Sequence, residues 1–196
     1  MSYHIYRTKG FILGSWDSKE ANKTFSIFTR EFGLIHASAQ SVRSISSKLR
    51  FHLQDLSLAD ISLVKGKEIW RIVSASGNEL YGSLKGNMEH VRLYVRILGL
   101  LKRLLHGEEK NERLFDMVNE AFEFLKSGKI PNEQMDNLEC ILVLKILHNL
   151  GYVGEPDKFK HFIEKTEWNE SFILAMAGVQ RDAIRAINQS LKESHL

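Results

Sequence analysis

The chain has 196 residues, of which 43% are hydrophobic and 26% are charged, and these values are those of an ordinary folded protein with a buried core. Its formal net charge of +3 is too small to indicate nucleic-acid binding without further evidence. Cys140 is the only cysteine, which excludes an internal disulfide and a zinc site made of cysteines.

Neither terminus nor interior of the sequence carries a membrane signal. His4, Arg7 and Lys9 interrupt the apolar run that a signal peptide would need. The most apolar segment, 91–105, is too short to span a bilayer and contains four cations. We therefore expect a cytoplasmic protein without a membrane partner.

The charges are distributed unevenly along the chain. Residues 1–85 hold 12 Lys and Arg against 7 Asp and Glu, a net charge of +5. Residues 86–196 hold 15 against 17, a net charge of −2. A polyanion is therefore expected to bind mainly to the first half, although such an excess also occurs on ordinary protein surfaces.

The first 76 residues show the two-residue periodicity of β-strands. The expected strands are 3–16, the two halves of a hairpin within 22–39, 55–65 and 68–76. Gly33 can take the positive φ that the hairpin turn requires. A short helix with a serine at its N-cap is expected over 46–53. Five strands with one helical interruption fit a small Greek-key barrel of the oligonucleotide-binding (OB) type.

From residue 87 the periodicity becomes helical. The expected helices are 88–105, 112–125, 135–150, 157–165 and 170–191. Gly151 follows the third of these at the position where glycine commonly ends a helix. We therefore predict an α+β protein with an OB-fold β-barrel domain at 1–80, followed by an all-α helical bundle domain at 81–196.

A family resemblance rests on the hairpin, whose sequence at 22–39 is NKTFSIFTREFGLIHASA. This segment resembles the N-terminal domain of the RecO family, in which a strand ending in L-F-T-R-E-x-G-L leads into the next strand. The other segments that resemble the family are 47–50 (SKLR), 63–73, 112–125 and 142–152 (LVLKILHNLGY). The order of a barrel followed by helices is also that of the family.

The resemblance implies a bacterial DNA repair and recombination mediator of the RecF pathway, cytoplasmic and associated with the nucleoid. Such a protein binds single- and double-stranded DNA, promotes annealing, and helps to load RecA onto DNA covered by single-strand-binding protein. The implied partners are DNA, RecR, the C-terminal tail of single-strand-binding protein and, indirectly, RecA. No cofactor is implied.

The chain departs from the family in two places. Many RecO proteins carry a four-cysteine zinc site after the L-G-Y phrase, whereas Cys140 stands alone here. The chain thus resembles a short variant without zinc. The family also has a basic, glycine-containing segment after the third strand, where this chain keeps only Arg43 in 40–43.

Cationic side chains of the first half are candidates for phosphate contacts, because such contacts are charge-assisted and release counterions. The candidates are Arg7, Lys9, Lys23, Arg30, Arg43, Lys48, Arg50, Lys65, Lys67 and Arg71. Arg43, Lys48 and Arg50 lie on one connection and form the favoured subset. The alternative is a solvated rim of charges that binds no ligand.

Four aromatic residues are candidates for base stacking in an OB barrel. They are Trp16, Phe28, Phe51 and Trp70. Phe28 is favoured, because Phe25 and Ile27 on the same strand are expected to face the core. The alternative for each ring is packing inside the barrel.

The resemblance also implies a site for the tail of single-strand-binding protein in the helical half. Its expected residues are Arg92, Tyr94, Arg96, Leu98 and Arg103, which offer cations for carboxylates beside apolar side chains. There are two alternatives: these arginines mark the solvent-exposed edge of a buried helix, or they pair with Glu112, Asp116 and Glu120.

Catalysis finds no support in the sequence, which has no glycine-rich phosphate loop, no H-E-x-x-H and no nucleophile elbow. Cys140 and His148 are too far apart on one helix to share a metal ion without a third element, so Cys140 is expected to be a small buried hydrophobe. We predict that the protein is not an enzyme. The alternatives to a DNA-binding mediator are a protein-only adaptor for RecR or the single-strand-binding protein tail, and an OB-fold RNA-binding protein.

Overall fold

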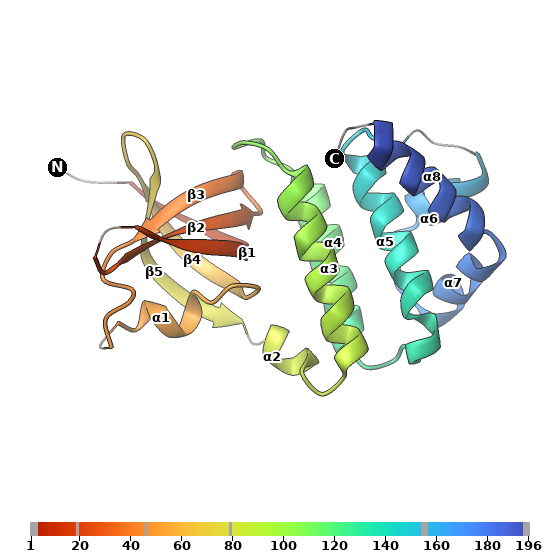
Figure 1. Ribbon diagram of the computed structural model, residues 1–196, viewed down its shortest axis with the longest axis horizontal. Coiled ribbons are helices and arrows are strands. Elements are labelled where there is room, and N and C mark those ends of the chain that lie inside the picture. Colours follow the sequence, from red (N-terminus) through yellow and green to blue (C-terminus); the bar gives the residue numbers. More distant parts are fainter. Residues whose placement is uncertain (1–3, 19, 46, 79, 154–156, 194–196) are drawn as a thin grey trace. The chain divides into compact units, whose positions relative to one another are not determined.

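The computed structural model describes residues 4–18, 20–45, 47–78, 80–153 and 157–193. Its first part contains five strands, which are β1 (Ile5–Ser18), β2 (Asn22–Thr29), β3 (Gly33–Ala39), β4 (Leu58–Lys65) and β5 (Trp70–Asn78). They form a closed barrel in the order β1-β2-β3-β5-β4 (Figure 1). Strands β3 and β5 pair in parallel, and the other neighbours are antiparallel. The predicted OB-like barrel, and with it the α+β class, is confirmed.

The short helix of the barrel differs from its prediction. Helix α1 (Leu49–His52) is a single turn, because Leu53 leaves the helical region with φ −107° and ψ 65°. Lys48 occupies the N-cap position and no side chain caps the helix, so the expected serine cap is wrong. Ser46, like Tyr3 at the start of the first predicted strand, lies outside the described residues.

The interior of the barrel is filled by alternate side chains of its strands, as the two-residue periodicity predicts. Phe25 and Ile27 of β2 are fully buried there, opposite Ala37 and Ile35 of β3. The core cluster comprises Ile12, Phe25, Ile27, Ile35, Ala37, Ala39, Val42, Leu53, Ala59, Ile61, Leu63, Trp70 and Ile72. The inward direction of Phe25 and Ile27 is therefore confirmed.

The chain divides into two compact units. The barrel unit consists of Met1–Ser83 and Leu98–Phe115, and the helical unit consists of Leu84–Ile97 and Asp116–Leu196. Helices α3 (Met88–Leu104) and α4 (Glu112–Lys126) therefore each contribute one part to either unit. The predicted division into an OB-fold domain at 1–80 and a helical domain at 81–196 remains a proposal.

Within the barrel unit, the loop between α3 and α4 lies directly on the turn between β2 and β3. The backbone N–H of Leu34 donates to the carbonyl oxygen of Gly107 at 3.1 Å. Gly33 has φ +68°, and a Cβ atom added there would lie 2.1 Å from the carbonyl oxygen of Glu109. Position 33 therefore needs glycine both for the turn and for the approach of this loop.

The first residues of α4 cover an apolar part of the outer barrel wall. The ring of Phe115 lies 5.1 Å from that of Phe11 and 5.4 Å from that of Phe28, measured between centroids. Phe11 and Phe28 are completely buried by this contact and their neighbours. The barrel thus has an inner core and a second, outer apolar contact.

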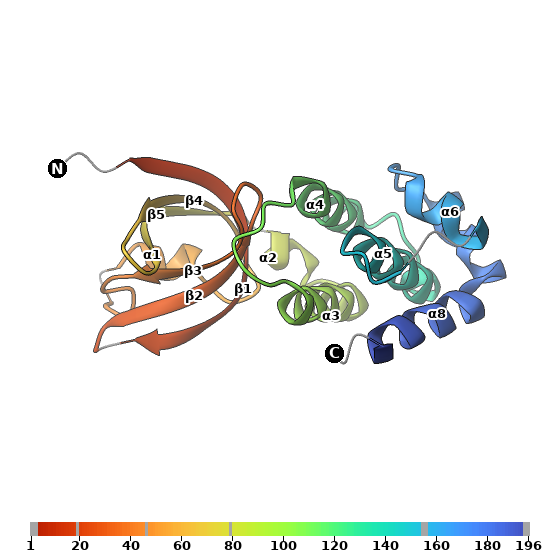
Figure 2. The ribbon, with the colours of Figure 1, turned by 90° about the horizontal axis from the view of Figure 1, so that it is seen from above.

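The helical unit also contains α5 (Met135–Asn149), α6 (Asp157–Glu164), α7 (Glu170–Ala175) and α8 (Gln180–Glu193), with the 3-10 turns η1 (Asn132–Gln134) and η2 (Met176–Gly178). Helix α2 (Leu80–Leu84) joins the two units along the chain. Helix α5 is apolar on almost every side and contacts α6 and α8 (Figure 2). Across the described ranges, the helices lack the combination of length and apolar character that crossing a membrane requires.

The single helix expected over 170–191 is wrong, because the chain breaks at η2. Val179 has φ −128° and ψ 3°, outside the helical region, and it follows Gly178, a weak helix former. The apolar residues on both sides keep a helical spacing, so periodicity alone does not reveal the break. Helix α7 begins as a separate helix with Asn169 at its N-cap, whose side chain accepts from the backbone N–H of Phe172 at 2.9 Å.

Lys145 is a buried cation of α5 and fastens the segment that follows α6. Its Nζ donates to the carbonyl oxygens of Ile163 at 2.9 Å and Lys165 at 2.5 Å. It also lies 5.7 Å from the ring centroid of Trp168. Carbonyl groups at the end of α6 thereby gain a charged donor in place of water.

His90 of α3 is a buried histidine, and we expect it to make stability depend on pH. Burial lowers its pKa from the ordinary value of 6.5, against the opposing effect of a hydrogen bond to the backbone of Ile130. As the pH falls below about 6.5, the unfolded chain therefore takes up this proton before the folded chain does, and the free energy of unfolding decreases.

In the variant His90→Gln, the free energy of unfolding should decrease less on acidification than in the wild type. The difference should be about 1.4 kcal/mol for each unit by which folding lowers the pKa of His90. Urea denaturation at a neutral and a mildly acidic pH measures the difference. The same substitution at exposed His36 controls for loss of a histidine. Identical pH dependence in His90→Gln and the wild type would contradict the expectation.

Candidate nucleic-acid interface

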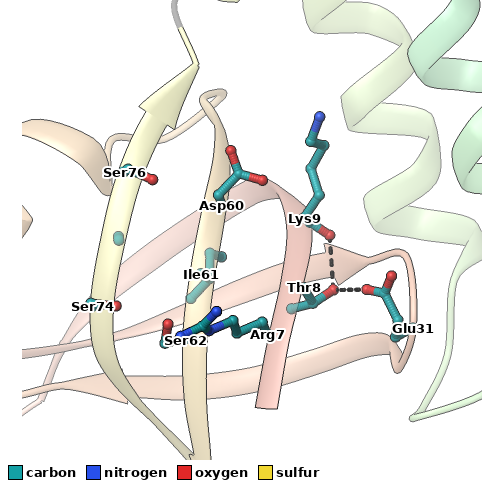
Figure 3. Close-up of a pocket in the computed structure, with 10 residues that line it drawn as sticks. Arg7, Thr8, Lys9, Glu31, Asp60, Ile61, Ser62, Ser74 and Ser76 are labelled. Atoms are coloured by element: carbon teal, nitrogen blue, oxygen red, sulfur yellow. Dashed lines mark hydrogen bonds between the residues drawn. The ribbon is translucent and has the colours of Figure 1, made fainter. Parts of the chain in front are cut away.

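One hollow on the outer wall of the barrel collects cations and hydroxyl groups from β1, β4 and β5 (Figure 3). The strand register forms two rows across this wall. The first row is Arg7, Ser62 and Ser74, and the second is Lys9, Asp60 and Ser76. The hollow has a volume of about 560 Å³. We call this surface the serine face.

The cations of the serine face are available to a ligand. Arg7 is exposed and Lys9 half-buried, and no carboxylate of the described chain forms a salt bridge with either. Glu31, at the edge of the hollow, accepts a hydrogen bond from the Thr8 hydroxyl and pairs with Arg30 at 3.5 Å. The serines are too short to cover Arg7, which lies across Ser62 in Figure 3. The geometry suits an anion that needs cations and hydroxyl donors together.

Several other predicted phosphate contacts are already engaged within the protein. Arg43 pairs with Asp17 at 3.2 Å, Arg30 lies 3.7 Å from Glu112, and Lys65 pairs with Glu108 at 3.2 Å. Lys23 donates to the Ser15 hydroxyl at 3.4 Å. A phosphate at these cations would have to compete with existing partners.

The favoured subset of Arg43, Lys48 and Arg50 is divided between two places. The side chain of Arg43 donates to the backbone of Glu20 at 3.3 Å, in the connection between β1 and β2. Arg50 lies on α1, with its guanidinium 5.2 Å from the ring centroid of Phe51, and α1 packs on β5. Lys48, Lys67 and half-buried Arg71 remain predictions as phosphate contacts.

The favoured stacking residue is wrong. Phe28 does point away from the barrel interior, but Phe115 covers it and leaves none of it exposed. Trp70 is also buried, and its indole N–H donates to Glu108 at 2.9 Å. Trp16 and Phe51 are exposed by 48% and 63%, so only these two of the four rings are accessible to a base.

The prediction that apolar residues of α3 are accessible to the tail of single-strand-binding protein is wrong. Tyr94 and Leu98 are buried, with the ring of Tyr94 4.5 Å from that of Phe122. Arg92 pairs with Glu89 at 2.5 Å and Arg96 with Glu139 at 2.6 Å, rather than with the expected acidic residues of α4. Arg103 is exposed and belongs to the barrel unit. The arginines thus lie on a solvent-exposed edge of α3, as the first of the two alternatives predicted. Within the described residues, they do not form the ion pairs of the second alternative.

Cys140 is buried, as expected of a small hydrophobe. Burial raises the pKa of its thiol to about 11, and the charge of Glu139 adds to this effect, so the thiolate is disfavoured. Over the described ranges, His, Cys, Asp and Glu side chains form no group of three or more that could hold a metal ion.

Sequence reasoning missed the hydroxyl groups of the serine face. Their signal is the alternation of serine with apolar residues in ISL at 61–63 and SAS at 74–76. That pattern identifies one wall of a strand pair as small and polar. It does not reveal that Arg7 and Lys9 of β1 complete the rows, because this depends on the pairing of β1 with β4.

The closed barrel of this strand order and its cationic outer wall define an OB-like protein with a helical region after the barrel. Residues 1–81 match the family model described as "Recombination protein O N terminal". This part of the chain is therefore similar to the N-terminal domain of the RecO family.

Curated relatives match about three quarters of the chain. DNA repair protein RecO of Alkaliphilus metalliredigens is 25% identical over 150 residues, which cover 76% of this chain and 58% of the relative. DNA repair protein RecO of Dehalococcoides mccartyi (strain BAV1) is 27% identical over 152 residues, or 78% of this chain and 58% of the relative. DNA repair protein RecO of Chlorobium limicola is 28% identical over 158 residues, or 79% and 59%. The match thus spans less than two thirds of each of these relatives.

Proposed function

We propose that the protein is a non-enzymatic recombination mediator that binds single- and double-stranded DNA through its barrel. The observation that carries the proposal is the serine face, where Arg7 and Lys9 lie beside Ser62, Ser74 and Ser76. Neither cation forms a salt bridge within the described residues, although Asp60 lies opposite Lys9. Backbone phosphates need cations and hydrogen-bond donors, and they carry no sequence information. A surface of this kind therefore suits DNA of any sequence.

Annealing follows from the same chemistry. Complementary strands repel each other through their phosphates, and a protein that neutralises these charges allows them to meet. The RecO family and the names of the relatives support a role in DNA repair. We infer from the family that RecR, single-strand-binding protein and RecA are partners, and that the protein acts in the cytoplasm on nucleoid DNA.

A protein-only adaptor is the second candidate, favoured by the carboxylate partners of Arg43, Arg30 and Lys65. Because these pairs reduce the cationic surface of the barrel, an adaptor is expected to show no DNA binding even at low salt. It would still bind RecR or the tail of single-strand-binding protein.

Charge reversal on the serine face is expected to weaken DNA binding. The double variant Arg7→Glu, Lys9→Glu should lose about tenfold or more in affinity for a labelled single strand, and its salt slope should fall by about 0.7 for each lost phosphate contact. Fluorescence anisotropy across a salt series measures both. Annealing of complementary strands should slow in parallel.

The matched control is the double variant Lys129→Glu, Lys192→Glu, which reverses two exposed lysines of the helical unit. It changes the net charge without touching the serine face, so its effect should be much smaller. Equal losses in both variants would indicate a long-range charge effect and would contradict a specific surface. A wild type that binds no DNA at low salt would favour the adaptor.

A further inference from the structure

A second surface of the barrel carries two neighbouring aromatic rings, from β1 and β3. Trp16 of β1 pairs with Thr24 of β2, which pairs with Ser38 of β3. In the next row, Gly14 pairs with Ser26, which pairs with His36. These six residues lie on the outer wall, because the residues between them on β2 and β3 point into the core. We call this surface the aromatic strip.

A β-bulge directs Trp16 to the outside. The register between β1 and β2 shifts between Ile12 and Gly14, so that Leu13 has no partner. Ile12 faces the core, and strict alternation would direct Trp16 there as well. The bulge instead leaves the large ring of Trp16 48% exposed on the outer wall.

The rings of Trp16 and His36 meet above the middle strand. Their centroids are 5.4 Å apart, at an interplanar angle of 71°. Thr24 and Ser26 between them are only 6% and 5% exposed. The two rings therefore meet nearly at a right angle, above the hydroxyl side chains of Thr24 and Ser26.

A cation lies beside these two rings. A Cβ atom added at Gly14 would be 2.8 Å from the Nζ atom of Lys102, so the ammonium group occupies the space that Gly14 leaves open. Lys102 lies in the part of α3 that belongs to the barrel unit. Within the described residues, no carboxylate forms a salt bridge with it. Asp17, next to Trp16, is already paired with Arg43.

The combination fits an unpaired base with its phosphate. Base stacking on an aromatic side chain needs an accessible ring, and the adjoining phosphate needs a cation. A duplex offers phosphates but keeps its bases stacked inside. The strip therefore has the chemistry to distinguish single strands from duplexes. The residues that line the serine face include no aromatic ring, so the serine face lacks this chemistry.

We propose that Trp16 and His36 form a stacking platform for an unpaired base of single-stranded DNA, with Lys102 binding the neighbouring phosphate. This inference rests on the proposed DNA-binding function and deepens it, because it assigns the preference for single strands to one surface.

The test compares affinities for a single strand and for a duplex of equal length. The variant Trp16→Ala should bind the single strand about 5- to 150-fold more weakly, since stacking contributes about 1 to 3 kcal/mol per base. Its affinity for the duplex should change less than about twofold, because no base of the duplex stacks on the ring. Trp16→Phe, which keeps a ring, should recover most of the loss, and the emission of Trp16 should be quenched by the single strand.

Further variants separate the parts of the strip. Lys102→Ala should lower the salt slope for the single strand by about 0.7. Ile69→Ala removes an exposed apolar side chain of the barrel unit outside the strip and should have little effect. Melting temperatures equal to that of the wild type show that each variant is folded.

The outcomes distinguish this inference from the proposed function. A wild type that binds neither DNA overturns the proposed function and the inference together. A wild type that binds DNA, with an unchanged Trp16→Ala variant, overturns the platform and leaves DNA binding in place. Losses of equal size for duplex and single strand, or a loss only for RNA of the same sequence, also overturn the platform.

Discussion

Replacing Phe115 by alanine is expected to lower the free energy of unfolding of the barrel unit by about 3 to 5 kcal/mol, the usual range for a buried phenylalanine. Phe115 is 1% exposed, and its ring contacts those of Phe11 and Phe28, which are completely buried. The substitution leaves a cavity between three rings. The barrel and the start of α4 cannot close it without moving the loop fixed at Gly33. Urea denaturation followed by tryptophan fluorescence measures the loss.

Two variants sharpen this test. Phe51→Ala removes a ring that is 63% exposed and should cost less than about 0.5 kcal/mol. Phe115→Leu keeps most of the apolar volume and should fall between the alanine variant and the wild type. A loss below about 1 kcal/mol for Phe115→Ala would show that the contact contributes little to stability.

Replacing Lys145 by methionine is expected to cost about 2 to 4 kcal/mol, because the carbonyl oxygens of Ile163 and Lys165 would lose their charged donor inside the protein. Methionine keeps the length and apolar character of the side chain, so the loss reports on the ammonium group. Hydrogen exchange should show the largest loss of protection in α6 and in the residues that follow it. Urea denaturation gives the global value.

Lys160→Met is the matched control, because Lys160 is an exposed residue of α6 whose ion pair within the described residues is with Glu164, at 3.8 Å. Pairs of this kind contribute about 0.3 to 0.5 kcal/mol. If both variants were equally stable, the buried ammonium group would not be needed to hold this segment. Because 153–170 contains no cysteine, Lys145 and the surrounding apolar residues must organise it without a cysteine metal site.

Local periodicity predicted the elements that depend on neighbouring residues. Alternation in 22–39 predicts the hairpin and the inward direction of Phe25 and Ile27, and Gly33 predicts its turn. The same alternation places Phe28 on the other wall, and this too is correct. It does not reveal that Phe115, 87 positions later, covers that wall, because long-range packing leaves no signal in a local pattern.

The failures in the candidate site have physical causes of the same kind. Tyr94 and Leu98 are spaced like residues of an accessible groove, but the spacing of a buried helix face is identical. Trp16 is accessible because a bulge between Ile12 and Gly14 interrupts the alternation of β1. Gly14, a glycine inside the predicted strand, indicates a bend or bulge there, but it does not show that Trp16 turns outward as a result. Ion pairs such as Arg43 with Asp17 depend on the connection between β1 and β2, so the sequence shows the cations but not which of them are engaged.

The contact of residues 98–115 with the barrel has a consequence for the order of folding during synthesis. A ribosome that has released only the five strands exposes Phe11 and Phe28 to solvent, together with the bare turn at Gly33. Phe115 and the loop at Gly107 cover these surfaces only after α3, the following loop and the start of α4 have emerged from the ribosome. The nascent barrel is therefore expected to remain incomplete, and prone to associate with other chains, until about residue 115 is available. A fragment that ends after β5 would keep Phe11 and Phe28 exposed to solvent.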